Sequence, residues 1–168
     1  LSPGNDSFTG DLVIRHNTTS PSDNLDTFTI NTGDQAVTFR SMTVDFNQAR
    51  ATAPLAFNLG ADATMTGAMT LTSGDVNVTG AHTLTVGGLT GENGNLNVAG
   101  NLTIDVAATG DYTYTGALTV GGKLTKSGEG AQTLAVGTEQ NPFLLNEVIS
   151  LTGGNLTLGG VSRLDVRA

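Results

Sequence analysis

The segment Gly116-Ala117-Leu118-Thr119-Val120-Gly121 contains the pattern that decides the fold of this chain. A glycine is followed by one or two small or polar residues, then by apolar residues that alternate with threonine, and in most copies by another glycine. The pattern recurs at residues 67–72, 80–87, 100–104, 130–137 and 154–159. A repeated unit of one strand and one turn builds length by stacking rather than enclosing a pocket. We therefore expect a fibre-like protein.

The composition predicts an ordered chain with a thin aliphatic core. Of the 168 residues, 38% are hydrophobic and only 5% aromatic, with no tryptophan, so the core must consist of leucine, valine, isoleucine, alanine and threonine methyl groups. Charged residues make up only 13%, whereas disordered chains combine low hydrophobicity with high charge. The regular alternation of apolar and polar residues also favours a folded chain.

The charge and the absent residue types exclude several classes of protein. The net charge of −8 would repel phosphate backbones, so we expect no nucleic-acid partner. The chain has no cysteine, which excludes disulfides and thiolate metal sites. No apolar run is long enough for a membrane-spanning helix, and residues 1–6 carry neither an initiator methionine nor a signal sequence. We interpret the sequence as a processed chain or a fragment.

The distribution of phenylalanine and glycine divides the chain near Gly60. Five of the six phenylalanines lie before this residue, and nineteen of the 23 glycines lie after it. We predict a small N-terminal β module over residues 1–60, acting as a joint or docking domain. Residues 61–168 are predicted to form a shaft of glycine- and threonine-rich β repeats.

The N-terminal module is predicted to contain three or four strands joined as hairpins. Alternating apolar residues with turn residues between them are typical of hairpins, and they occur at residues 12–14, 27–30, 36–39 and 42–46. Residues two apart point the same way on a strand, so six side chains are expected on one buried face: Phe28, Ile30, Val37, Phe39, Val44 and Phe46. Residues 47–57 are interpreted as a helical turn before Pro54.

The shaft is predicted to be all-β, with strands of about four or five residues that need neighbours above and below. Two architectures meet this need: a β-solenoid formed by one chain, or a β-prism formed by three intertwined chains. Both place Leu, Val and Ile inward and Thr and Asn outward, and the sequence leaves both open. The uneven length of the units leaves the trimer open in particular. Residues 141–149 break the pattern, and Asn141-Pro142 predicts one helical turn or a packed loop there.

No group of residues predicts a catalytic, cofactor or metal site. His16 and His82 are the only histidines, and neither has a partner at the spacing of metal ligands, so we interpret both as surface residues. A polysaccharide-cleaving site would need two nearby carboxylates, for which the candidate pairs are Asp105 with Asp111 and Glu129 with Glu139. We interpret all four as solvated acids on turns or exposed faces. The protein is therefore predicted not to be an enzyme.

Two further features are candidates for contact with a partner. Tyr112 and Tyr114 flank Thr113 and would share one face of a strand, which makes a candidate exposed aromatic pair for a sugar or a protein. Thr-x-Thr units also recur, for example at residues 70–72 and 83–85, and ranks of such units resemble ice-binding proteins. Because the units are unevenly spaced, we expect no flat, regular threonine array.

Residues 12–23, 26–33 and 116–125 resemble the shaft segments of bacteriophage tail or head fibres. That resemblance implies a homotrimer carried on a virion, which binds a host surface glycan or protein. Residues 112–134 include Thr113-Tyr114-Thr115-Gly116 and Leu124-Thr125-Lys126, and they are similar to the repeat of autotransporter passenger domains. The unit occurs once here, whereas passenger domains usually carry many copies. This second resemblance implies a monomeric solenoid on a bacterial outer surface, with an adhesive or scaffolding role.

The expected function is that of a non-enzymatic structural or adhesive fibre protein, foremost a phage virion fibre segment used in host-surface attachment. The alternative is a secreted bacterial surface β-solenoid, either an autotransporter-like adhesin or a subunit of an extracellular filament. The expected partners are copies of the chain in a homotrimer or filament, other virion or cell-surface proteins, and a host surface glycan. We expect no cofactor, no metal, no nucleic acid and no membrane span, and a location on a virion or outside the cell.

Overall fold

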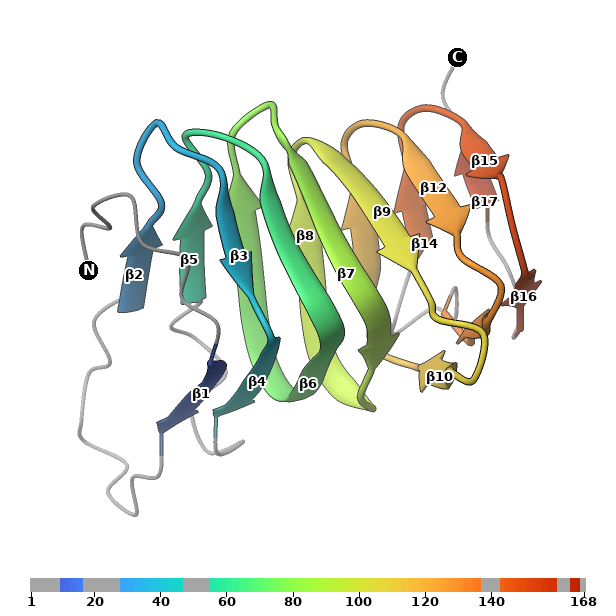
Figure 1. The fold of residues 1–168 in the computed structure, drawn as a ribbon, viewed down its shortest axis with the longest axis horizontal. Coiled ribbons are helices and arrows are strands. Elements are labelled where there is room, and N and C mark those ends of the chain that lie inside the picture. Colours follow the sequence, from blue (N-terminus) through green and yellow to red (C-terminus); the bar gives the residue numbers. More distant parts are fainter. Residues whose placement is uncertain (1–9, 17–27, 47–54, 137–142, 160–163, 167–168) are drawn as a thin grey trace.

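The computed structural model describes residues 10–16, 28–46, 55–136, 143–159 and 164–166. In these ranges the chain is all-β and winds into a parallel β-solenoid of about five turns (Figure 1). This confirms the predicted all-β class. Of the two architectures that the sequence leaves open, the structure is the single-chain solenoid.

The strands form three ladders, which we call sides A, B and C, and the chain visits them in that order. Side A contains β3 (Val37–Phe39), the start of β6 (Ala63–Thr79), β7 (Thr83–Thr90), β9 (Asn101–Asp105), β12 (Leu124–Ser127) and β15 (Ile149–Leu151). Side B contains β1 (Asp11–His16), β4 (Ser41–Phe46), the middle of β6, the end of β7, β10 (Asp111–Tyr114), β13 (Ala131–Leu134) and β16 (Asn155–Leu158). Side C contains β2 (Phe28–Asn31), β5 (Leu55–Asn58), the end of β6, β8 (Asn93–Val98), β11 (Leu118–Val120), β14 (Phe143–Leu145) and β17 (Leu164–Val166).

Neighbouring turns pair through parallel strands on all three sides, except between β7 and β10 on side B. On side C, for example, Leu55 lies beside Val76, which in turn lies beside Leu96. The hairpins predicted for the N-terminal part are therefore wrong: β1, β2 and β3 pair with β4, β5 and β6 and not with one another. Because β3 and β4 both pair with β6, the strand pairing continues across the boundary predicted near Gly60.

Neither predicted helical turn occurs among the described residues. Residues 47–54 of the first segment lie outside them, and the described remainder begins the strand β5 at Leu55. In the second segment residues 141–142 likewise lie outside, while Phe143–Leu145 forms β14 and Ile149 begins β15. The described residues of both segments are extended where they form β5 and β14, and residues 146–148 form a loop, which is the other alternative predicted for the second segment. The helical turn predicted before Pro54 lies outside the described residues.

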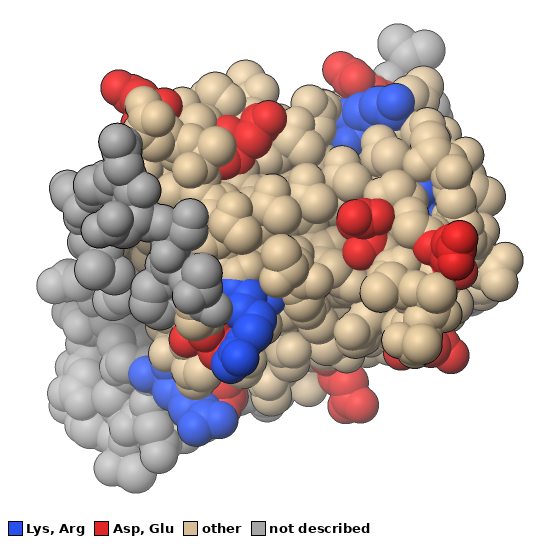
Figure 2. All heavy atoms as spheres, viewed as in Figure 1, with Lys and Arg blue, Asp and Glu red and all other residues tan. Residues whose placement is uncertain are grey.

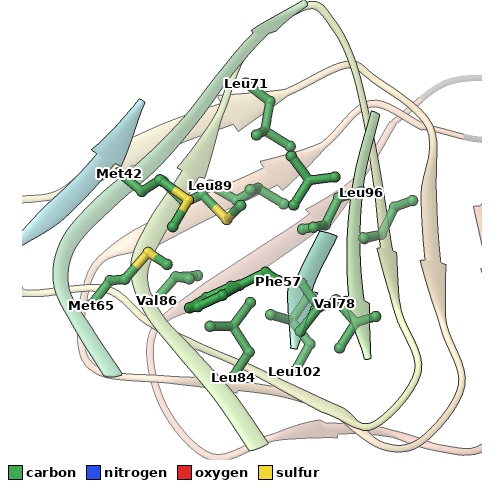
Figure 3. Close-up of a cluster of buried hydrophobic side chains, with 14 of the residues drawn as sticks. Met42, Phe57, Met65, Leu71, Val78, Leu84, Val86, Leu89, Leu96 and Leu102 are labelled. Carbon is green, nitrogen blue, oxygen red and sulfur yellow. The ribbon is translucent and has the colours of Figure 1, made fainter. Parts of the chain in front are cut away.

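The core is a column of apolar side chains supplied by triplets in which two inward residues flank one outward residue, most often Thr or Asn. Leu118 and Val120 are both fully buried around Thr119, as predicted. Figure 3 shows such side chains from all three sides meeting inside the coil, with the ring of Phe57 among them. Burying one Leu or Val contributes about 1.5–3 kcal/mol, so repeated triplets stabilise the coil turn by turn.

The phenylalanine-rich part uses the same core. Ile30, Phe39, Val44 and Phe46 are buried as predicted, Val37 is partly buried, and the side chain of Phe28 lies outside the described residues. These residues belong to strands of sides C, A and B, and not to one face of a hairpin sheet. Their side chains meet in the interior because all three sides point their inward residues at the same axis.

Uneven turn lengths are absorbed at the corners between sides. Asn77 and Asn97 hydrogen-bond across adjacent turns at a separation of 20 residues, whereas Asn31 and Asn58 do so at 27. Glycines let some corners pass close to the turn below. A Cβ atom at Gly91, where φ is 129°, would lie 1.9 Å from the carbonyl oxygen of Leu71. Within the residues that the structure places, no helix is long and apolar enough to cross a membrane.

Candidate functional site

The candidate site lies where the ladder of side B is interrupted. Strands β10, β13 and β16 form a separate three-stranded sheet, whereas the other described strands form one sheet of fourteen. Between β7 and β10 the only strand-type pairing in the described chain is a bridge from Gly91 to Tyr114. The backbone of Thr115 continues this contact by donating a hydrogen bond to the carbonyl of Gly91 at 2.9 Å. At this interruption, the backbones of the two turns are therefore hydrogen-bonded near Gly91 but not along the rest of β7 and β10.

A buried glutamine satisfies the backbone groups that the interruption leaves unpaired. The backbone N–H of Leu89 donates to Oε1 of Gln132 at 3.0 Å, and Nε2 of Gln132 donates to the carbonyl of Leu89 at 2.9 Å. Gln132 is 1% exposed and Leu89 is fully buried, so water has no access to these groups. The amide therefore replaces two backbone hydrogen bonds that a continuous ladder would have made.

The ring of Tyr112 occupies the space between β7 and β10. A Cβ atom at Gly88 would lie 2.2 Å from a carbon of this ring, so the ring fills the volume that a side chain at residue 88 would need. The edge of the ring also lies close to Gly110. Tyr112 remains partly exposed while packing against the core. Glycine at residue 88 thus allows the aromatic ring to sit at the interruption.

Tyr114 has a different position from the one expected. It is fully buried, and its hydroxyl donates to the carbonyl of Gly94 at 2.5 Å and lies 3.0 Å from the carbonyl of Ala117. Burial raises the pKa of its phenol well above the ordinary value. The prediction of an exposed aromatic pair is therefore wrong for Tyr114, because its buried ring cannot reach a partner. Contact between Tyr112 and a partner stays a prediction.

A hollow of about 530 Å³ lies at the interruption, on the corner between sides B and C. Its wall consists of Thr72, Thr90, Gly91, Glu92, Asn93, Asp111, Tyr112, Thr113 and Thr115. Among the described residues, the wall contains two carboxylates, an amide, four threonine hydroxyls and the phenol ring of Tyr112, and no lysine or arginine. The sequence identifies Asp111 and Tyr112 as candidate residues but not Glu92, because Glu92 lies on the corner between β7 and β8 and the sequence does not show the course of that corner.

The structure places Asp105 and Asp111 on different sides of the coil, whereas the pair of Glu129 and Glu139 lies partly outside the described residues. Asp105 ends β9 on side A and accepts a hydrogen bond from Ser127 at 2.8 Å, whereas Asp111 begins β10 on side B. Glu129 is exposed on a corner, and Glu139 lies outside the described residues. Among the described residues, Asp111 instead shares the hollow with Glu92.

The two histidines do not form a site in the described structure. Nδ1 of His82 lies 3.9 Å from the carboxylate of Asp62, and both side chains are largely solvated. His16 ends β1, and its side chain is outside the described residues. Searched over the described ranges, the chain has no cluster of three or more His, Asp or Glu residues that could hold a metal ion.

A buried lysine is the second polar residue that the sequence did not reveal. Lys126 takes an inward position on β12, where the pattern elsewhere has an apolar residue, and it is fully buried. Its Nζ donates to the carbonyls of Ser127, Gly128 at 3.1 Å and Gly153 at 3.4 Å. Burial lowers the pKa of this amine, and the nearby charge of Asp105 opposes that effect. The ammonium group of Lys126 thus provides hydrogen-bond donors for corner carbonyl groups of two adjacent turns.

Threonines form regular columns in spite of the uneven turn lengths. The register on side A aligns Thr38, Thr64, Thr85, Thr103, Thr125 and Ser150. The corners absorb the differences in length and keep this single column in register, but the column is not a rank of Thr-x-Thr units. The column is one hydroxyl wide, since the neighbouring positions Thr83, Asn101 and Lys123 differ in chemistry. The face seen in Figure 2, with side A in front, is mostly uncharged and has no continuous basic patch.

Comparison with known proteins adds no relative: no family model, no curated protein and no solved structure matches this chain.

Proposed function

We propose that this chain is a non-enzymatic structural segment of an extracellular fibre or surface adhesin, in which the solenoid acts as a rigid spacer. The observation that carries the proposal is the closed core, because one chain buries its own apolar column from Ile14 to Leu145. Among the described residues, no buried side-chain polar atom lacks a hydrogen-bond partner. A body of this kind gains length by adding turns of about 4.8 Å without changing its cross-section.

The closed core favours a bacterial surface solenoid over a trimeric virion fibre. A trimeric β-prism needs three chains to complete each layer of its core, whereas here sides A, B and C all come from one chain. A spacer of the autotransporter-passenger kind would present this coil as a monomer on an outer surface. Its role would be to hold an adhesive region away from its anchor.

One observation favours the virion fibre as a second candidate. Large apolar side chains are exposed in the last turns, namely Leu144 at 38%, Val148 at 60%, Leu151 at 57% and Leu158 at 40%. Copies of the chain could cover these residues in a homotrimer. Val13, in the first described strand, is also exposed, at 51%. Exposed apolar side chains are typical of an interaction surface where they form a contiguous patch.

Light scattering of the purified chain at several concentrations tests the proposal. A mass near 17.1 kDa at all concentrations supports the monomeric spacer, and a stable trimer supports the virion fibre instead. A reducing-sugar assay of the same sample on soluble polysaccharides tests the non-enzymatic part. New reducing ends that disappear in the double variant Glu92→Gln, Asp111→Asn would overturn it.

A further inference from the structure

We propose that the hollow at the interruption of side B binds a neutral glycan, with one sugar ring packed against Tyr112. This inference rests on the proposed extracellular role, because a displayed protein is the kind that meets such glycans. The candidate residues are Glu92, Asp111, Tyr112 and Thr113, which come from two adjacent turns of the coil.

The hollow is built into the coil and is not a gap left by poor packing. The interruption of the ladder would leave both backbone groups of Leu89 buried without hydrogen-bond partners, which is unfavourable. Gln132 removes that cost with two hydrogen bonds of 3.0 and 2.9 Å. The opposite end is held by the bridge from Gly91 to Tyr114 and by Thr115. The two strands are thus fixed apart, and the hollow needs no rearrangement to receive a ligand.

The chemistry of the wall fits a sugar. Tyr112 provides a partly exposed aromatic ring, one edge of which lies close to Gly88. The C–H face of a pyranose ring is apolar and can pack on such a ring, while the hydroxyls around it need polar partners. A volume of about 530 Å³ lies within the range of small-ligand pockets and accommodates two or three sugar rings.

The charge of the wall selects among glycans. Glu92 and Asp111 both line the hollow and are exposed, and within the described part of the chain no hydrogen bond or ion pair engages either carboxylate. Both can accept hydrogen bonds from sugar hydroxyls, and charge-assisted bonds of this kind are stronger than neutral ones. None of the described residues of the wall is a lysine or arginine, so a uronate or sialate carboxylate would meet like charge with no counterion among them. We therefore infer a neutral glycan.

The test is saturation-transfer difference NMR on the whole chain with five probes: maltohexaose, cellohexaose, mannohexaose, N-acetylchitohexaose and hexagalacturonate. We expect at least one neutral probe to receive saturation and to shift the ring signals of Tyr112, while those of buried Tyr114 stay in place. Hexagalacturonate should show no transfer. If none of the four neutral probes binds, or if hexagalacturonate binds best, the inference is overturned.

Variants locate the binding. Glu92→Gln and Thr113→Arg change exposed positions of the hollow, so neither should alter the thermal melt, and each should weaken binding at least tenfold. Glu129→Gln removes an exposed acid at a corner outside the hollow and should bind like the wild type. Binding that survives both hollow variants overturns the inference even if the chain is a monomeric spacer. A trimer that binds through the hollow would reject the spacer and keep the glycan site.

Discussion

The side-chain amide of Gln132 makes two hydrogen bonds with the backbone of Leu89, although the strand β10 lies between their turns. The chain thereby interrupts one of its three ladders without leaving buried polar groups unpaired. The same interruption makes room for Tyr112 and opens the hollow beside it. One residue thus links the stability of the core to the candidate binding site.

Replacing Gln132 with leucine should destabilise the protein strongly. The backbone N–H and carbonyl of Leu89 would remain buried without partners, which costs at least about 2 kcal/mol in the free energy of unfolding. Urea unfolding measures the loss, and hydrogen exchange at the Leu89 amide should accelerate more than exchange at Leu84. The control is Thr133→Val at the neighbouring outward position. If exchange at Leu89 were unchanged in Gln132→Leu, the replacement of ladder bonds by the amide would be refuted.

Substitutions at two adjacent residues test the inward and outward assignment. Leu118→Asp places an unpaired charge in the core and should lower the free energy of unfolding by more than about 3 kcal/mol. Thr119→Asp puts the same carboxylate on the outside and should change it by less than about 0.5 kcal/mol. Thermal melts followed by circular dichroism compare the two variants. Equal melting temperatures would contradict the assignment.

Tyr114 should make the fold sensitive to alkali. Burial raises the pKa of its phenol above the ordinary 10.0. Below pH 10 the phenol is neutral in both states, and its contribution to stability is fully present. Above that pH the unfolded chain loses the proton while the folded chain retains it, so stability falls as the pH rises towards the folded pKa.

Tyr114→Phe separates this effect from the titration of other groups. At neutral pH the variant should lose about 1 kcal/mol, because the hydrogen bond to Gly94 is gone. Between about pH 9 and pH 11 its unfolding free energy should fall less than that of the wild type. Urea unfolding at each pH gives both values. Parallel pH profiles for the two proteins would show that Tyr114 is not the alkaline-sensitive group.

Duplicating one turn should yield a longer and more stable coil. Val76 pairs with Leu96, so a second copy of residues 76–95 inserted after Asn95 keeps every strand in register. Each added turn buries further apolar side chains while exposing no new end of the coil. The free energy of unfolding should therefore increase by about 1 kcal/mol or more, and the melting temperature should rise by several degrees. The control carries the same inserted residues in scrambled order and should melt lower than the wild type. A lower melting temperature for the ordered duplication would argue against a spacer that grows by turns.

The sequence predicts which side chains point inward but not which strands are neighbours. The alternation in Leu118-Thr119-Val120 assigns burial correctly because residues two apart share a face in any strand. The same alternation occurs in hairpins and in parallel coils, so residues 27–39 were assigned to a hairpin. The turn residues at 31–34 instead form a corner that leads to the next side. Pairing with a strand one turn away leaves no local signal in the sequence.

The polar residues of the interior also escaped sequence reasoning. Gln132 and Lys126 occupy positions that the alternation marks as inward, and this conflict was the available signal. What each one binds depends on other turns, Leu89 for the glutamine and Gly153 for the lysine. For the tyrosines, alternation placed Tyr112 and Tyr114 on one face of the strand. It did not show that this face points towards the core.

The parallel pairing of each strand with the strand one turn on has a consequence for how the protein forms. Partners such as Asn77 and Asn97 lie only 20 residues apart, so no segment waits for a distant part of the chain before it can pair. Each completed layer offers its open backbone edge as a template for the next. A chain that emerges from a narrow pore can therefore fold progressively, one layer at a time. The free energy released as each layer pairs with the previous one would then favour further emergence of the chain.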